Sequence, residues 1–382
     1  MGPLTGVTVI ELAGIGPAPF CAMLLADMGA RVIRVDPPYS STDYAPNPVL
    51  ERSRESIRVD LKQPPGRDVV LRLVSSADAL VEGFRPGVTE RLGVGPADCL
   101  AVNPRLVYGR MTGWGQTGPL ASSAGHDINY IGMTGALHAI GRAGSAPVPP
   151  LNLVGDFGGG ALYLAFGIAC ALLEAARSGS GQVVDAAVVD GTVSLLGLVH
   201  GLRAQGLWTD ERGTNLLDTG APWYDVYACR DGGYMAVGAL EEKFFVALLD
   251  GLGLNDNEEL RASHRDRARW PQLRAALTSA FLSRNRDEWA AVFDGVDACC
   301  TPVLSLTEAE QHPHARARQL HLPLPPPLST TQPAPAPRFS RTEASMPGTP
   351  PRPGENTRAL LAEHGYTSEQ IDSLLTQKAV AE

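Results

Sequence analysis

The N-terminal part of the chain alternates apolar and polar stretches in the order strand, helix, strand. Residues 7–12 form a short apolar run rich in β-branched side chains, interrupted by Glu11. Residues 19–28 repeat apolar positions with a helical period, and residues 31–35 have the pattern of a buried strand that ends at Asp36. This order predicts a βαβ unit, which belongs to a parallel sheet covered by helices.

The turn after the first predicted strand departs from the loop that binds dinucleotides. Gly14 and Gly16 begin a glycine motif, but residues 17–19 read Pro-Ala-Pro, so the third glycine is missing. Proline has no backbone N–H, and pyrophosphate binding at this turn depends on such amides. We therefore expect a doubly wound, Rossmann-like α/β fold without a dinucleotide site.

Similar alternation extends to about residue 199. The sequence predicts a helix at residues 69–74, strands at residues 79–81, 106–108 and 182–189, and a turn at Asp190-Gly191. The longest apolar stretch, residues 157–173, holds three consecutive glycines. We interpret it as a buried core helix, and no contact with a membrane is expected.

The character of the chain changes in its second half. Residues 205–225 are rich in Gly, Asp, Thr and Asn and predict a long connection. A strand at residues 234–237 and several amphipathic helices then predict a second, smaller domain. The proline-rich residues 323–337 predict an extended surface connection, and residues 355–375 are again helical in pattern.

Composition narrows the class of protein. The 382 residues are enough for two or three domains, and a net charge of −9 argues against sequence-independent nucleic-acid binding. Residues 1–6 lack the features of a signal peptide, and the last four residues are not a peroxisomal address. The six cysteines show no paired spacing, so reduced thiols and a cytoplasmic location are expected, with a redox pair at Cys299-Cys300 as the weaker alternative.

Two glycine-marked turns contain the residues best suited to proton chemistry. His126-Asp127 lies within residues 124–130, and Asp156 lies within residues 152–160. An imidazole and a carboxylate both exchange protons near neutral pH once their surroundings tune them. If the fold places His126 and Asp156 on opposite sides of one carbon, that carbon loses a proton to one group and regains it from the other, with inversion.

His126, Asp127 and Asp156 could instead have purely structural roles. Asp127 and Asp156 each precede a helical pattern, where carboxylates often serve as caps, and His126 beside such a cap is an ordinary surface residue. The amides at the Asp127 helix start carry partial positive charge that suits an oxyanion. The glycines at residues 158–160 lose much backbone entropy on folding, and close approach of a ligand is one reason for their presence.

Other candidate functional residues point less clearly to a function. Glu241 alone suggests only a helix start, and the segment His312-Pro313-His314 lacks nearby acidic or cysteine partners, so no metal site is expected. Some of the basic residues in the N-terminal part could hold phosphates, because the guanidinium fork matches phosphate geometry. These residues are Arg52, Arg54, Arg58, Lys62, Arg85 and Arg91.

Further landmarks accompany the two turns over nearly the whole chain, at residues 6–14, 60–62, 82–88, 112–119, 220–224, 301–303 and 337–340. With them the sequence resembles the alpha-methylacyl-CoA racemases of the family III CoA-transferase superfamily. The resemblance implies an interlocked homodimer whose chains each have a Rossmann-like large domain built from both chain ends and a smaller α+β domain. The boundaries expected are residues 1–198 for the large domain, 199–224 for a linker, 225–300 for the small domain, and 301–382 for a linker and the returning C-terminal part.

The resemblance also implies roles for individual residues. His126 and Asp156 are the two catalytic bases, Glu241 orients His126 across the dimer interface, and Asp127 supports them at the helix start. The residues implied in contacts with CoA or substrate are Val59, Asp60, Leu61, Lys62, Gly83, Phe84, Arg85, Arg91, Gly125, Ile128, Asn129 and Tyr130. No metal and no separate cofactor is implied, because coenzyme A is part of the acyl-CoA substrate.

Three functions follow from the resemblance and the residues. The first is racemisation of 2-methylacyl-CoA thioesters through an enolate. The second is CoA transfer between carboxylic acids with Asp156 as nucleophile, and the third is acyl-CoA binding without catalysis. The transferase branch has an aromatic residue in place of His126 and a glycine-rich loop near residues 238–241, so this sequence favours proton transfer. Residues 36–38 read Asp-Pro-Pro where racemases often have Asp-Arg-Pro, so one phosphate contact is expected to be lost.

Overall fold

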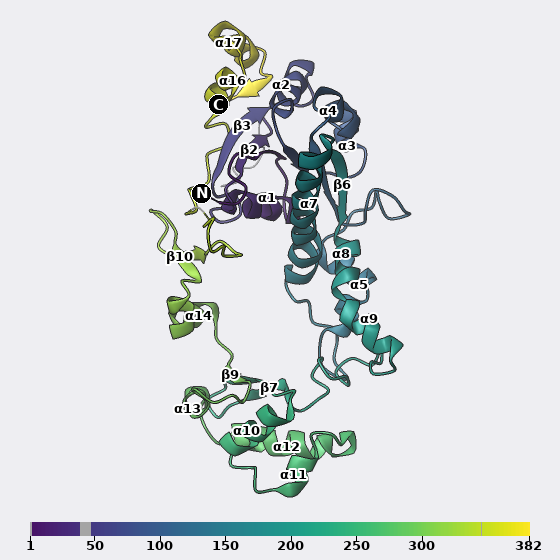
Figure 1. Cartoon of the computed structure of the whole chain (residues 1–382), viewed down its shortest axis with the longest axis vertical. Helices are drawn as coiled ribbons and strands as arrows, with labels where there is room; N and C mark the ends of the chain where they lie inside the picture. The colour runs from purple at the N-terminus through teal and green to yellow at the C-terminus, as the bar shows by residue number, and fades with distance from the viewer. Residues whose placement is uncertain (1, 39–46, 345) are drawn as a thin grey trace. The chain divides into compact units, whose positions relative to one another are not determined.

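The computed structural model describes residues 2–38, 47–344 and 346–382 and divides into two compact units (Figure 1). Unit 1 comprises Met1–Thr134, Leu151–Leu195 and Gln319–Glu382, and unit 2 comprises Gly135–Pro150 and Leu196–Arg318. This grouping differs from the domain boundaries expected from the sequence, because residues 135–150 and 301–318 lie in unit 2.

Unit 1 contains a seven-stranded sheet in the order β12-β3-β2-β1-β4-β5-β6. Its strands are β1 (Thr8–Leu12), β2 (Arg31–Asp36), β3 (Arg54–Val59), β4 (Ala79–Glu82), β5 (Val107–Thr112), β6 (Gln182–Ala187) and β12 (Val380–Ala381). Strands β1 to β6 run parallel, whereas β12 pairs antiparallel with β3. The order of β1 to β6 is that of a Rossmann sheet, so the predicted α/β fold is confirmed.

Helices cover both faces of this sheet because side chains alternate along the strands. On β1, Val9 packs with α1 (Pro17–Asp27) and α7 (Leu162–Ser178), whereas Ile10 and Leu12 pack with α2 (Pro64–Val74). The other helices of unit 1 are α3 (Val88–Leu92), α4 (Pro96–Val102), α5 (Asp127–Met133), the π-helix η1 (Leu153–Ala161), α8 (Val188–Leu195), α16 (Thr357–Glu363) and α17 (Ser368–Thr376).

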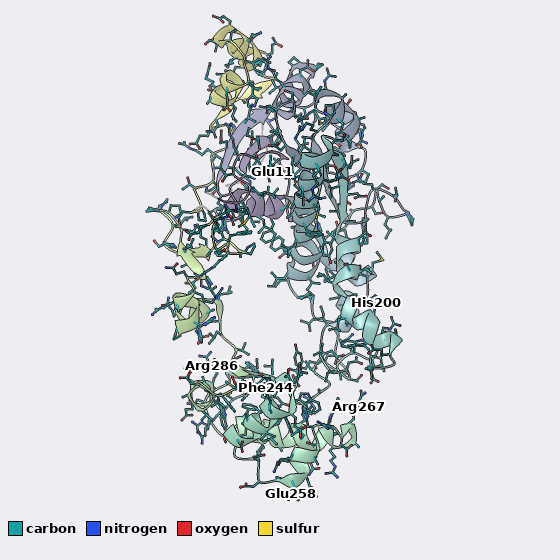
Figure 2. The ribbon with its side chains drawn as sticks, in the orientation of Figure 1. Glu11, His200, Phe244, Glu258, Arg267 and Arg286 are labelled. Atoms are coloured by element: carbon teal, nitrogen blue, oxygen red, sulfur yellow. The ribbon has the colours of Figure 1, made fainter. Side chains whose placement is uncertain are left out.

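Strand β3 was not predicted, because charged residues interrupt its pattern. Arg54 on β3 pairs with Glu11 on β1 at 2.6 Å, and both side chains are fully buried. Figure 2 labels Glu11 among the strands of the sheet. This ion pair explains the glutamate within the first apolar run, since a buried charge requires a partner.

The structure corrects the predictions for residues 182–191. Strand β6 ends at Ala187, and Asp190-Gly191 lies inside α8 instead of forming a turn. A methyl carbon placed on Gly191 would lie 1.8 Å from the carbonyl oxygen of Gly159. Contact between the backbones of α8 and η1 therefore requires this glycine, which explains why a turn signal stands within a helix.

The apolar stretch that begins at Phe157 is only half buried. Together η1 and α7 form a helical run, Leu153–Ser178, that is long and apolar enough to cross a bilayer by length and composition, as core helices of soluble proteins also are. Leu164 and Ile168 are buried against the sheet, whereas Phe166 is 69% exposed. The prediction of a buried core helix is therefore wrong for its outer face.

The C-terminal segment returns to the sheet of unit 1, where β12 lies beside β3 (Figure 1). The helix predicted at residues 355–375 is in fact two helices, α16 and α17. They are separated at Gly365, whose φ of 82° suits a glycine at a helix end. The proline-rich connection contributes β11 (Thr331–Pro333), which pairs antiparallel with β10 (His321–Pro323).

Unit 2 has a three-stranded antiparallel sheet of β7 (Tyr224–Ala228), β8 (Tyr234–Gly238) and β9 (Cys300–Pro302). The strand predicted at residues 234–237 is confirmed. The helices are α6 (Ala136–Ala139), α9 (Gly197–Ala204), α10 (Glu242–Gly251), α11 (Glu258–Ala262), η2 (Arg267–Arg269), α12 (Trp270–Phe281), α13 (Arg286–Val292), α14 (Leu306–Gln311) and α15 (Pro313–Ala317). Arg142 joins residues 135–150 to this unit by pairing with Asp225 at 2.6 Å.

Candidate active site

One cavity of unit 1, which we name the main cavity because His126 and Asp156 line it, lies where the strand order reverses, between β1 and β4. It has a volume of about 310 Å³ and is lined by residues 15–17 after β1, residues 83–86 after β4 and residues 111–114 at the end of β5. Open α/β sheets bind ligands in such crevices, because loops at the carboxyl ends of the strands converge there.

His126 reaches the cavity from the position just before α5. Its backbone is extended, with φ of −132°, and its N–H donates to Asn129 Oδ1 at 3.0 Å. His126 is thus the N-cap residue, and Asp127 is the first residue of the helix, one position after the cap. The cap fixes the backbone from which the imidazole extends.

Asp156 lies in the π-helix η1, a wide helix that is rare and frequently found at functional sites. The N–H of Phe157 donates to the carbonyl of Asn152 at 3.1 Å, the spacing of a π-helical hydrogen bond. The N–H of Asp156 donates to Asp127 Oδ1 at 2.7 Å. This hydrogen bond joins the two glycine-marked turns that the sequence separates.

Close helix packing accounts for the glycines around Asp156. A methyl carbon placed on Gly155 would lie 2.3 Å from Asp127 Oδ1, and one on Gly159 would lie 2.7 Å from the backbone nitrogen of Thr192. A methyl carbon on Gly160 would lie 3.1 Å from the Val188 side chain. Protein atoms therefore occupy the space for which the sequence suggested a ligand, and that expectation is corrected.

The surroundings of Asp156 raise the pKa of its carboxyl group to about 6. Burial is the largest cause, and repulsion by the Asp127 carboxylate is the second. A hydrogen bond from the Asn152 side chain and the charge of His126 oppose both by favouring the ionised form. A carboxyl group with this pKa both donates and accepts a proton readily near neutral pH.

An aromatic pair supports the wall that leads to His126. The rings of Trp114 and Tyr130 meet edge to face with centroids 4.8 Å apart, and the Tyr130 hydroxyl donates to the carbonyl of Gly125. A methyl carbon placed on Gly113 would lie 2.0 Å from the Tyr130 ring. The glycines at positions 113 and 125 thus make room for the tyrosine beside the cavity.

A second cavity in unit 1, of about 420 Å³, lies at the carboxyl ends of β1, β2 and β3. Its lining residues are Leu12, Ala13, Val35, Asp36, Pro37, Pro38, Val59, Asp60, Leu61, Lys62, Phe84 and Leu92. Phe84 lines both cavities. The Asp36 carboxylate accepts hydrogen bonds from Arg34 Nε at 2.9 Å and Ser56 Oγ at 2.6 Å, so it is already engaged by protein groups.

The two cavities bring together part of the predicted site. The main cavity includes His126, Asp156, Gly83, Phe84, Arg85, Gly125 and Tyr130, and the second includes Val59, Asp60, Leu61 and Lys62. Arg91, Asp127, Ile128 and Asn129 are not among the residues that line either cavity. Glu241 belongs to unit 2, where it is the N-cap residue of α10. The catalytic and binding roles of all these residues stay predictions.

The structure adds residues that the sequence did not assign to the site. In the main cavity they are Ile15, Gly16, Pro17, Pro86, Met111, Thr112, Gly113, Trp114, Ala121, Ser123, Ala124 and Val188. Gly16 has φ of 73°, and a methyl carbon placed on it would lie 3.5 Å from Asp156 Oδ2. The sequence contained one signal for Gly16, namely its position directly after the first predicted strand. Ligands bind at the carboxyl ends of the strands in a parallel sheet.

The described residues contain no group of three or more His, Cys, Asp or Glu that could hold a metal ion. All six cysteines are free thiols, and four of them are buried. The thiols of Cys299 and Cys300 thus form no disulfide in this structure.

Comparison with known proteins agrees with the architecture. CoA-transferase family III matches residues 4–357. The chain is 45% identical over 379 residues to alpha-methylacyl-CoA racemase from Mus musculus, covering 99% of this chain and 97% of that protein. It is 43% identical over 382 residues to alpha-methylacyl-CoA racemase from Homo sapiens, with the same coverage. A solved structure of a CAIB/BAIF family protein from Brucella suis matches with a TM-score of 0.79 and 28% identity, covering 95% of this chain and 99% of that one.

These matches confirm the resemblance seen in the sequence motifs. They extend over nearly the whole chain, and the solved structure shares the α/β architecture. The chain therefore belongs to CoA-transferase family III.

Proposed function

We propose that this protein interconverts the epimers of 2-methylacyl-CoA thioesters by moving one proton at the α-carbon. The observation that carries the proposal is that His126 and Asp156 line one cavity and that the pKa of Asp156 is about 6. The similarity to the two mammalian racemases supports the same reaction for this chain.

The reaction proceeds through an enolate. The thioester carbonyl acidifies the α-hydrogen, neutral His126 removes it from one face, and protonated Asp156 returns a proton to the other face. The reverse reaction starts from ionised Asp156 and protonated His126. The pair holds one proton in either resting form, so its apparent pKa values belong to both groups together.

The enolate oxygen requires hydrogen-bond donors near the α-carbon. Backbone amides at the start of α5 are the candidates, because His126, the N-cap residue of this helix, lines the cavity. One such donor is typically worth about 3–4 kcal/mol of transition-state stabilisation. No step requires a metal or a redox cofactor.

We assign the nucleotide end of coenzyme A to the second cavity. Its lining is mainly apolar, its charged residues are Lys62, Asp36 and Asp60, and Phe84 links it to the main cavity. The Arg85 side chain belongs to the segment that lines the main cavity. Pro37-Pro38 lies at the end of β2, where an arginine of the racemase motif would add a phosphate contact.

The active form in this proposal is a homodimer in which Glu241 of one chain orients His126 of the other. The support in unit 1 is an apolar surface on the outer side of η1, α7 and α8. Its exposed side chains are Leu153, Leu162, Phe166, Leu173, Val193 and Leu195. An apolar surface shared by three helices is typical of an interface, and a two-fold dimer is the commonest way to cover it.

One experiment separates the candidate reactions. A single 2-methylacyl-CoA epimer is incubated with the protein in deuterated water, with and without a carboxylate acceptor. We expect deuterium at the α-carbon together with the appearance of the other epimer. Transfer of CoA to the acceptor without α-deuteration would instead establish a CoA-transferase with Asp156 as nucleophile. Tight CoA binding without either reaction would leave only a binding function.

A further inference from the structure

The segment between β4 and α3 lies between the two cavities of unit 1. Residues 83–86 line the main cavity, and Phe84 also lines the second. This segment packs closely on α1, because a methyl carbon placed on Gly83 would lie 3.2 Å from the Ala18 side chain. Any ligand that occupies both cavities therefore passes this segment, and its conformation affects both ends of that ligand.

A buried carboxylate holds the beginning of this segment. Glu82, the last residue of β4, is 0% exposed. One of its oxygens accepts a hydrogen bond from the N–H of Phe84 at 2.7 Å, and the other accepts from Arg110 Nε at 3.0 Å. The carboxylate thus connects the backbone of a residue that lines both cavities to a side chain on β5.

The same arginine holds the end of the segment. Arg110 Nη1 donates to Glu90 Oε1 on α3 at 2.8 Å, and Arg110 itself is buried. Glu82 and Glu90 flank the segment in the sequence, and both bind this one guanidinium. The segment is therefore attached at both ends to a single residue of β5.

Two other buried ion pairs in unit 1 can be compared with the pair formed by Glu82 and Arg110. Glu11 pairs with Arg54 between β1 and β3, and Asp27 on α1 pairs with Arg52. Arg52 donates further to Gln332, so this pair ties α1 to β11. A buried ion pair is weak evidence for stabilisation, because desolvation opposes the attraction. Glu82 differs from Asp27 because it holds the amide of a residue that lines both cavities.

We propose that Glu82 is a positioning residue that fixes the conformation of residues 83–86 through the Phe84 amide and Arg110, and thereby sets the affinity for the CoA part of the substrate. The inference rests on the proposed use of acyl-CoA. Glu82 touches no reacting atom in this account, so its loss affects substrate binding more than the proton-transfer step.

Burial also gives Glu82 a titration near neutral pH. Its pKa is raised to about 7 by burial, while the Phe84 N–H and Arg110 on β5 oppose this and Glu90 on α3 reinforces it. The charge of Glu82 also acts on the hydroxyl of Tyr108 on β5, whose pKa it helps to raise. The ionised form, which accepts both hydrogen bonds, therefore predominates above about pH 7, and CoA affinity is expected to fall below it.

The test compares Glu82→Gln with Asp27→Asn. Both substitutions remove a buried charge paired with an arginine, but Asp27 and Arg52 line neither cavity. The glutamine can still accept from the Phe84 N–H, but it cannot pair with Arg110. We expect Glu82→Gln to raise KM for acyl-CoA and the Kd for coenzyme A about tenfold, with kcat changed less than about threefold. Asp27→Asn should leave both constants unchanged.

A second measurement uses pH. The Kd for coenzyme A is measured by calorimetry between pH 6 and about 8 in the unaltered protein and in Glu82→Gln, because the phosphate monoester of coenzyme A also loses a proton in this range. We expect Kd to decrease more steeply as pH rises through about 7 in the unaltered protein than in the variant. An unchanged Kd in Glu82→Gln, or the same pH dependence in both proteins, would overturn the inference. Failure of the proposed function looks different, since the unaltered protein would then show no α-deuteration of the substrate.

Discussion

At the scale of single residues, the sequence indicated His126 and Asp156 as candidate proton-transfer groups, and the structure places both at one cavity. It did not reveal Asn152 or Gly16, which approach the Asp156 carboxylate only once η1 and α1 have folded. It also gave Asp127 only a supporting role. The structure shows that this carboxylate accepts a hydrogen bond from the Asp156 backbone and raises the pKa of the Asp156 side chain.

Replacing Asp127 and replacing Asn152 should shift the pH dependence of kcat/KM in opposite directions, because these two residues have opposite effects on the pKa of Asp156. In Asp127→Asn the amide oxygen can still accept the Asp156 N–H, but the repulsive charge is gone, so the pKa of Asp156 falls. For the epimer whose α-hydrogen Asp156 removes, Asp156 must be ionised, so the acidic limb of kcat/KM should then move to lower pH. In Asn152→Ala a hydrogen bond to the ionised form is lost, so the pKa rises and the limb should move to higher pH. Limbs that move together or not at all would contradict this account of Asp156.

At the scale of elements, the sequence predicted most of the first parallel strands but misjudged residues 182–191. Their β-branched run and Asp190-Gly191 signal are local properties, whereas the switch from β6 to α8 depends on packing against η1. Tertiary contacts override local preference in such segments. Strand β3 was missed for a similar reason, since its arginine is acceptable only opposite Glu11.

The packing of α8 on η1 should control both stability and activity. In Gly159→Ala the new methyl group meets the backbone of Thr192, which cannot move without shifting α8. We expect a loss of about 1–3 kcal/mol in the free energy of unfolding and a lower kcat, because η1 carries Asp156. Thermal and denaturant unfolding with kinetic assays measure both. Gly201→Ala on α9, where a methyl group meets no other atom, is the control and should not lower stability.

At the scale of the whole molecule, the motifs indicated the family and the Rossmann-like sheet. They could not assign residues 135–150 to unit 2, because that assignment depends on long-range contacts such as Arg142 with Asp225. The outer face of α7 was likewise unexpected. An apolar sequence alone does not distinguish a helix buried on all sides from one that keeps an apolar face for a partner.

The exposed face of α7 should determine the oligomeric state. Phe166→Glu places a charge where we propose the second copy to bind, so the dimer should dissociate at micromolar protein concentration. Light scattering after size-exclusion chromatography measures the mass. Leu306→Glu is the control, since Leu306 is 88% exposed on α14 of unit 2 and is not one of the side chains of this apolar face. A monomeric unaltered protein would contradict the proposed dimer.

The most direct test of the proton-transfer account follows α-deuteration of each epimer separately in His126→Ala and Asp156→Asn. Each variant retains one base, so neither should racemise the substrate. Each should still exchange the α-hydrogen of the one epimer that faces its remaining base, and the two variants should exchange opposite epimers. His200→Ala, which alters an exposed histidine on α9 labelled in Figure 2, should behave like the unaltered protein. Exchange of the same epimer by both variants, or racemisation without His126, would contradict the account.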